Sequence, residues 1–85
     1  MLMLDVLKPH TPDSLEFASA LAEQGPDYHV TFTVQEVDEK TETVVIVIKG
    51  EDIQFEAIVE AIAQNGGSLH SIDQVEVVSG NAQEG

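Results

Sequence analysis

Cysteine and arginine are absent from the 85 residues. Without cysteine the chain has no disulfide framework, no thiolate metal site and no paired-cysteine motif of a heavy-metal chaperone, and it suits a reducing compartment such as the cytoplasm. Without arginine it lacks the guanidinium groups with which an acylphosphatase-type enzyme holds phosphate. These two absences exclude two functions that small α+β domains can have.

Positive charge is also scarce, since three lysines face 16 acidic residues and the net charge is −13. With aromatic residues at only 5%, this charge argues against a nucleic-acid partner, because RNA-recognition modules need a basic surface and exposed aromatic side chains. The acidic residues are spread along the chain, which favours a solvated surface adapted to salt over the alternative of a binding surface for a basic partner. Salt should therefore stabilise the protein by screening its self-repulsion.

The first residues, Met1 to Asp5, show neither a basic n-region nor an apolar run long enough for a signal peptide or a membrane span. We therefore expect a cytoplasmic protein without a membrane partner. A chain of 85 residues supports only one hydrophobic core. Residues 1–85 are expected to form a single domain, with a short flexible tail at about residues 80–85.

Hydrophobic periodicity and turn residues predict six elements in the order strand, helix, strand, strand, helix, strand. The strands are expected at about residues 2–7, 28–37 and 42–48 and within residues 68–79. The first helix is expected to have Thr11 as its N-cap and to end near Gln24, and the second to lie between Asp52 and Asn65. The apolar stripe expected on the first helix consists of Leu15, Ala18, Leu21 and Ala22.

This order predicts a ferredoxin-like βαββαβ sandwich of the α+β class, an antiparallel four-stranded sheet with two helices on one face. Within it we expect the two central strands to run parallel and the edge strands to run antiparallel to them. In the last strand, Leu69 and Ile72 have opposite parity, which indicates a bulge near Ser71 or a late strand start.

The third strand, from Glu42 to Ile48, is apolar on both faces. Because two helices can cover only one face of the sheet, the other face is expected to carry aliphatic side chains into a subunit contact. The sequence therefore predicts a homo-oligomer.

No catalytic residue is assigned. The chain has no nucleotide-binding glycine motif and no calcium-binding helix-loop-helix pattern. His70 lies near Ser71 and Asp73, but on an extended strand it points to the opposite face, so these residues should not form one catalytic constellation. His70 is better interpreted as a hydrogen-bonded structural histidine, and a weak hydrolase using it stays open as an alternative.

Carboxylates give the better candidate site. Asp5 lies in the middle of the first strand, where a charge needs a partner or a cation. Glu36 shares the parity of the core-facing residues of its strand, so it either points at the rim of the core or marks a bulge. Because calcium takes about six to eight oxygen ligands, two chains of an oligomer could supply them together. The candidate ligands of calcium or another divalent cation are Asp5, Glu36, Asp38 and Asp73, with a solvated acidic surface as the alternative.

Two motifs near the chain ends carry a family resemblance. They are the runs Leu4-Asp5-Val6-Leu7-Lys8-Pro9-His10 and Gly66-Gly67-Ser68-Leu69-His70-Ser71-Ile72-Asp73, with Glu36-Val37-Asp38 and Thr41-Glu42 between them. With these motifs nearly the whole chain resembles an archaeal family of uncharacterised proteins, domain of unknown function 211. The resemblance implies the ferredoxin-like fold, ring-shaped homo-oligomers, divalent cation binding and no assigned activity. It singles out Asp5, His10, His70 and Asp73, while the missing arginine and the more acidic surface depart from the family pattern and fit a halophilic member.

The leading hypothesis is a non-catalytic oligomeric module that binds a divalent cation or a small ligand at subunit interfaces. The rival is an amino-acid-sensing, ACT-like regulatory domain that binds its effector near Lys8 to Thr11, at the junction of the first strand and helix. There His10 precedes a helix N-terminus and neighbours Lys8, which together suit an anion. The candidate ligand-binding residues are Lys8, His10 and His70.

Overall fold

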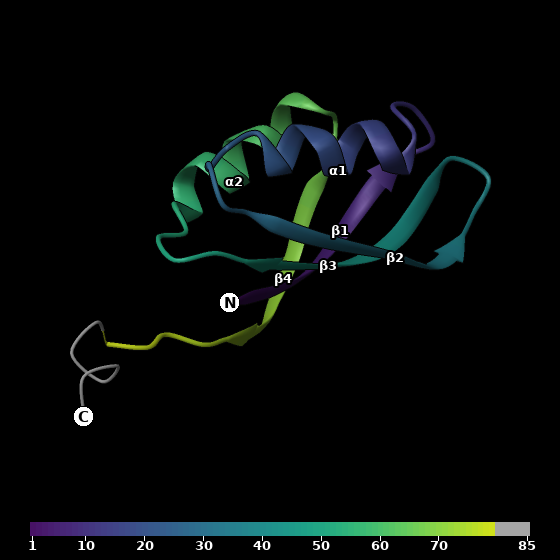
Figure 1. Ribbon diagram of the computed structural model, residues 1–85. Coiled ribbons are helices and arrows are strands. Elements are labelled where there is room, and N and C mark those ends of the chain that lie inside the picture. The colour runs from purple at the N-terminus through teal and green to yellow at the C-terminus, as the bar shows by residue number, and fades with distance from the viewer. Residues whose placement is uncertain (80–85) are drawn as a thin grey trace.

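Six elements follow in the predicted order in the computed structural model, which describes residues 1–79. They are β1 (Leu2–Pro9), α1 (Ser14–Ala22), β2 (His29–Val37), β3 (Thr41–Lys49), α2 (Phe55–Gln64) and β4 (Ser68–Val75). The tail expected at about residues 80–85 lies outside the described residues. The strands form one four-stranded sheet and both helices lie on the same face of it, which confirms the ferredoxin-like fold (Figure 1).

The strand order is β2-β3-β1-β4, and all three pairings are antiparallel. The expectation of two parallel central strands is therefore wrong, since β1 and β3 run in opposite directions. Each crossover through a helix returns the chain parallel to the strand it left, but one position further away in the sheet. As a result β1 is parallel to β2 and β3 is parallel to β4, and neither parallel pair is adjacent.

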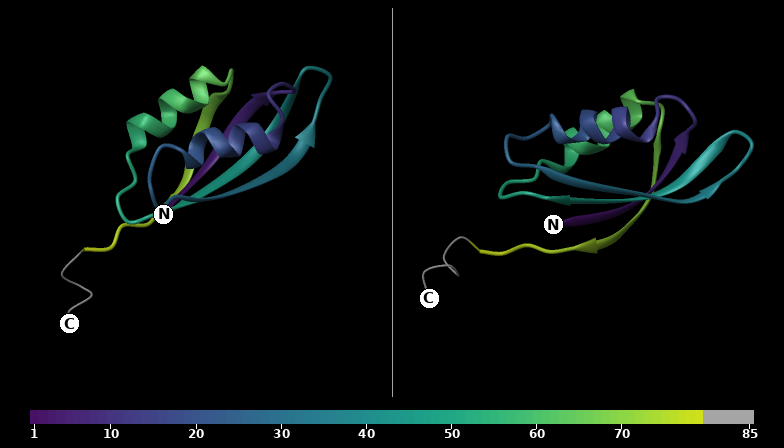
Figure 2. Two further views of the ribbon diagram at one scale, coloured as in Figure 1. Left: turned by 45° about the horizontal axis from the view of Figure 1, so that its top comes forward. Right: turned by 45° about the vertical axis from the view of Figure 1, so that its right-hand side comes forward.

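The hydrophobic core fills the space between the helices and the sheet. The buried apolar side chains come from both central strands and both helices: Leu2, Leu4, Val6, Phe17, Leu21, Val44, Ile46, Ile48, Ile58, Ala61 and Ile62. Figure 2 shows the two helices side by side above this face of the sheet. Within residues 1–79, no helix is long and apolar enough to cross a membrane.

The first helix differs from its prediction at its start and on its buried face. Asp13, and not Thr11, is the N-cap, because its carboxylate accepts a hydrogen bond of 2.9 Å from the backbone N–H of Glu16. Phe17 and Leu21 form the buried face, whereas Leu15 is 76% exposed. Phe17 fixes this orientation because its ring packs on Phe32 of β2, with 5.6 Å between the ring centroids.

The connection from α2 to β4 ends the helix through glycine, as the sequence predicted. Gly66 has a φ of +82°, in the left-handed region that glycine adopts without strain. The N–H of Gly67 then donates to the carbonyl of Ile62 at 2.9 Å. A Cβ atom on Gly67 would lie only 2.8 Å from Cζ of Phe17, so this position needs glycine for packing as well.

Two strands contain the irregularities that the sequence indicated. The register of β4 against β1 shifts between Met3 and Leu4 and between Asp5 and Val6, which confirms a bulge near Ser71. The register of β2 against β3 shifts between Val34 and Glu36. Of the two interpretations of Glu36, the bulge is thus the one observed.

Replacing Phe17 by alanine should lower the free energy of unfolding by about 3–5 kcal/mol, because it removes a fully buried ring and leaves a cavity against Phe32. The matched control is Leu15→Ala on the same helix, where the exposed side chain should cost less than about 0.5 kcal/mol. Urea unfolding followed by circular dichroism measures both. Equal losses in the two variants would contradict the observed orientation of the helix.

Candidate functional site

One face of the sheet is not covered by either helix (Figures 1 and 2). Alternate residues of β1 point to this open face, so Leu4 and Val6 are fully buried in the core while Asp5 and Leu7 are not. Val45 and Val47 of β3 are only half-buried, whereas their neighbours Val44, Ile46 and Ile48 are fully buried. The open face therefore combines aliphatic side chains with one carboxylate at its centre.

A hollow of about 240 Å³ lies on this open face and is lined by Asp5, Leu7, Thr43 and His70. Strand pairing places Leu7 opposite Thr43 and Asp5 opposite Ser71. The bulge in β4 inserts His70 between the partners of Asp5 and Val6, and in this way the imidazole comes to line the same hollow as the Asp5 carboxylate.

The Asp5 carboxylate is the group in this hollow that lacks a partner. Its Oδ1 atom is buried and forms no hydrogen bond to any described residue. The residue opposite on β3 is Val45, which offers no polar side chain. Leaving a buried polar atom unpaired costs about 1–3 kcal/mol, and more when the group is charged. A cation or a hydrogen-bond donor from outside the described residues would stabilise an oxygen in this position.

The other predicted metal ligands lie elsewhere in the fold. Glu36 lies on β2 and Asp38 follows that strand, whereas Asp73 lies on β4. Since β3 lies between β2 and β1, one chain does not bring Glu36 and Asp38 to Asp5. Asp73 lies on β4, which pairs directly with β1 and places Ser71 opposite Asp5. Asp73 also accepts a 2.7 Å hydrogen bond from the hydroxyl of Ser71. Among residues 1–79, no group of three or more histidine or acidic side chains is placed to hold a metal ion.

Lys8 and His10 belong to an ion-pair network at the end of β1. Lys8 is fully buried, and its ammonium donates to the Pro9 carbonyl at 2.8 Å and to Oε1 of Glu42 at 3.4 Å. Nδ1 of His10 lies 2.9 Å from Oε2 of the same Glu42 carboxylate. Both residues predicted to bind a ligand are thus engaged within the chain.

Glu42 is a member of this network that was not predicted from the sequence. Strand alternation contained the signal, because Lys8 has the parity of core residues Leu4 and Val6, and Glu42 has the parity of Val44. A lysine and a glutamate on the core side of two neighbouring strands each need a partner of opposite charge. The register of β1 with β3 places them directly opposite each other.

The surroundings of His10 favour its charged form. Nδ1 faces the Glu42 carboxylate, and Nε2 lies 2.9 Å and 3.0 Å from the carbonyls of Asp38 and Glu39 in the β2–β3 turn. All three partners are acceptors, and only the imidazolium carries a proton on both nitrogens. The hydrogen bond with Glu42, followed by that with the Glu39 carbonyl, raises the pKa of His10 above 6.5. The same bond with His10 is the largest cause that lowers the pKa of Glu42 below 4.5.

Comparison with known proteins shows the family. The model of domain of unknown function 211 (DUF211), described as uncharacterised ArCR, matches residues 1–82. This chain belongs to the archaeal DUF211 family. A relative from Methanocaldococcus jannaschii, named only as uncharacterised protein MJ0319, is 42% identical over 74 residues, which cover 87% of this chain and 76% of the relative.

The His10–Glu42 pair predicts a defined pH dependence of stability. Because the folded pKa of His10 is raised, its contribution is complete below 6.5 and is lost as the pH rises through the folded value. Because the folded pKa of Glu42 is lowered, its contribution is complete above 4.5 and is lost as the pH falls through the folded value. The melting temperature at constant salt should therefore fall as the pH is raised from about 6 to 9.

The variant His10→Gln should lose most of this fall, whereas His29→Gln should keep it, because His29 is exposed at the start of β2 and lies outside the network. Thermal unfolding between about pH 5 and 9 provides the measurement. A fall of the same size in His10→Gln would assign the pH dependence to other groups.

Proposed function

We propose that this DUF211 protein is a non-catalytic module that self-associates through its open sheet face and binds a divalent cation there through Asp5. The observation that carries this proposal is the buried Oδ1 of Asp5, which has no partner among the described residues. At this position in the strand, an apolar side chain would destabilise the folded protein less than a carboxylate without a partner. A cation and a covering surface together would account for the carboxylate and for the aliphatic side chains around it.

Self-association is supported by the distribution of apolar side chains on the two central strands. Leu7 is 42% exposed on the open face, and the half-buried Val45 and Val47 lie on the neighbouring strand. An apolar surface on a chain with a net charge of −13 is unfavourable in water unless another surface covers it. A second copy of the chain offers the same apolar face, so a contact with two-fold symmetry would cover both faces at once.

The residues around the hollow fit a cation of intermediate softness. Asp5 would supply a carboxylate oxygen, His70 an imidazole nitrogen and Thr43 a hydroxyl oxygen. Imidazole beside carboxylate suits zinc better than calcium, which prefers oxygen ligands alone. One chain offers too few ligands for a closed site, so the proposal includes a contribution from a second copy.

The remaining candidate ligands belong to a different part of the proposed assembly. Glu36 and Asp38 lie near one outer strand of the sheet, and Asp73 lies on the other. In a ring-like assembly that joins unlike edges, these carboxylates would meet across neighbouring subunits. Their role as cation ligands, like the ring itself and the adaptation to salt, stays a prediction.

The ACT-like alternative receives no support from the geometry at Lys8. An effector bound between Lys8 and Thr11 would have to displace the hydrogen bonds that the buried ammonium makes to Glu42 and to the Pro9 carbonyl. Removing one partner of a buried charge is costly. We therefore advance only the first function.

Sedimentation equilibrium tests the association. In about 2 M KCl, where charge repulsion is screened, the protein should run as more than one copy, and Leu7→Ser should shift it toward the monomer. The matched control is Leu15→Ser, which removes an exposed leucine from the helix face of the molecule and should leave the assembly intact. A wild-type monomer at every protein concentration in this salt would overturn the proposed association.

Calorimetric titration with manganese, zinc and calcium chlorides tests the cation site separately. The variant Asp5→Asn should bind the preferred ion at least about tenfold more weakly, since it removes a charged ligand. The matched control Glu56→Gln removes an exposed acidic charge from α2 and should change nothing. Without cations, Asp5→Val should melt at a higher temperature than the wild type, because it removes the unpaired oxygen. Unchanged affinity in Asp5→Asn, or no heat with any of the three ions, would overturn the cation site.

A further inference from the structure

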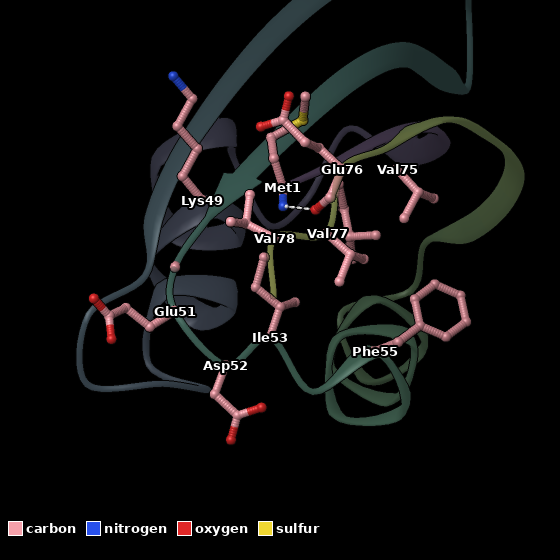
Figure 3. A pocket seen from close by; sticks show the side chains of 12 residues that line it. Met1, Lys49, Glu51, Asp52, Ile53, Phe55, Val75, Glu76, Val77 and Val78 are labelled. Atoms are coloured by element: carbon pink, nitrogen blue, oxygen red, sulfur yellow. Dashed lines mark hydrogen bonds between the residues drawn. The ribbon is translucent and has the colours of Figure 1, made fainter. Parts of the chain in front are cut away.

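A second concave surface lies at the start of β1 and shares no residue with the hollow, which Asp5 and Leu7 of the same strand line. It is a groove of about 860 Å³ between the loop that leads from β3 into α2 and the segment that continues β4. Figure 3 shows its apolar side chains, which come from both sides: Ile53, Phe55, Val75, Val77 and Val78. Neither the fold nor the proposed cation site requires a groove at this place.

The apolar side chains of this groove are unusually exposed. Val77 is 85% exposed, Val78 64% and Val75 56%, and even Phe55 is 37% exposed. They account for four of the nine large apolar residues that are exposed in the described part of the chain. Single exposed apolar residues are ordinary, but a group of them around one groove marks a binding surface.

The backbone beside the groove is also available. The N–H of Glu76 donates to the carbonyl of Met1 at 2.8 Å and ends the pairing of this segment with the sheet. Beyond it, Val77 and Val78 follow an extended path and form no backbone hydrogen bond to any described residue. An extended peptide can therefore add its own backbone here as a further strand.

The charge around the groove decides what kind of chain fits. Glu51, Asp52 and Glu76 contribute three carboxylates to its lining, against the ammonium of Lys49 and the α-ammonium of Met1. The whole chain carries a net charge of −13. Nucleic acid and anionic membranes would be repelled. Apolar side chains flanked by lysine or arginine would be attracted.

We propose that the groove binds an extended segment of a partner protein in which apolar residues and lysine or arginine residues alternate. Alternation suits an added strand, because apolar side chains then face the valines and Phe55 while basic side chains face the acidic rim. This inference goes beyond the cation-binding function and stands on a separate surface. It also gives a location to the alternative that the acidic residues form a binding surface for a basic partner.

Fluorescence anisotropy with three labelled peptides of about eight residues tests the proposal. One alternates valine and lysine, the second replaces valine by serine, and the third replaces lysine by glutamate. In about 0.5 M KCl, where general attraction to a polyanion is screened, the valine–lysine peptide should bind at least about tenfold more tightly than either of the others.

Two pairs of variants assign the binding to the groove. The double variant Val77→Ser, Val78→Ser should weaken binding of the valine–lysine peptide at least about tenfold, whereas Val37→Ser, an exposed valine on β2, should not change it. Likewise Glu51→Gln with Asp52→Asn should weaken binding, whereas Glu23→Gln with Glu56→Gln should not. All of these side chains are exposed, so the variants should fold, as circular dichroism can verify.

Two results would overturn the proposal. Equal affinity of the wild type and the Val77→Ser, Val78→Ser variant would show that the peptide binds to acidic surface in general. Loss of self-association in that variant, with no binding of any peptide, would show that a second copy occupies the groove. Because Leu7→Ser tests self-association at the open face, failure of one proposal would be distinguishable from failure of the other.

Discussion

The two central strands set a constraint that the rest of the molecule has to satisfy. Every second residue of β1 and β3 enters the core, and the residues between them point to the opposite face of the sheet. In a chain of 85 residues, the two short helices are enough to seal one face, with Phe17 and Leu21 on α1 and Ile58 and Ile62 on α2. The other face keeps the aliphatic side chains of a central strand without a layer to cover them.

The same alternation explains why two charged groups occupy such different environments. Lys8 points into the core side of β1, where Glu42 on the adjacent strand and backbone carbonyls satisfy its ammonium. Asp5 points to the open face, where β3 offers the apolar Val45 and the Ser71 hydroxyl of β4 donates to Asp73, so its Oδ1 has no partner among the described residues. The charge on the sealed side is thus satisfied within the chain, whereas the carboxylate on the open side keeps an oxygen without a partner among the described residues.

Local patterns in the sequence predicted the elements well because each depended on neighbouring residues. The strand alternation, the glycine exit of α2 and the bulge implied by the opposite parity of Leu69 and Ile72 are all of this kind. The errors concern contacts between distant residues. Phe17 was missed as the anchor of α1 because its partner, Phe32, lies on another element. The relative direction of β1 and β3 was wrongly predicted because it depends on how many strand positions in the sheet each crossover skips.

The candidate site shows the same division. Asp5 could be singled out because a carboxylate in the middle of a strand breaks a local rule. Its neighbour in the hollow, His70, was assigned to the opposite face from Ser71 by strict alternation, and strict alternation gave no reason to pair it with Asp5. Only the bulge in β4 brings the imidazole to the lining of the hollow. Glu42 could have been found by combining strand parity with the register of β1 and β3, but a single sequence does not provide that register.

The two register shifts in β4 also affect how this outer strand can meet other molecules. A regular edge with exposed valines is a template on which strands can stack without limit, as they do in fibrils. The six residue pairs between β1 and β4 run from Leu7 opposite Ser68 to Leu2 opposite Val75, and the register shifts twice among them. A long straight strand cannot follow such an edge, so only a short segment can pair with it. The irregular edge therefore limits aggregation in a part of the molecule that exposes apolar side chains.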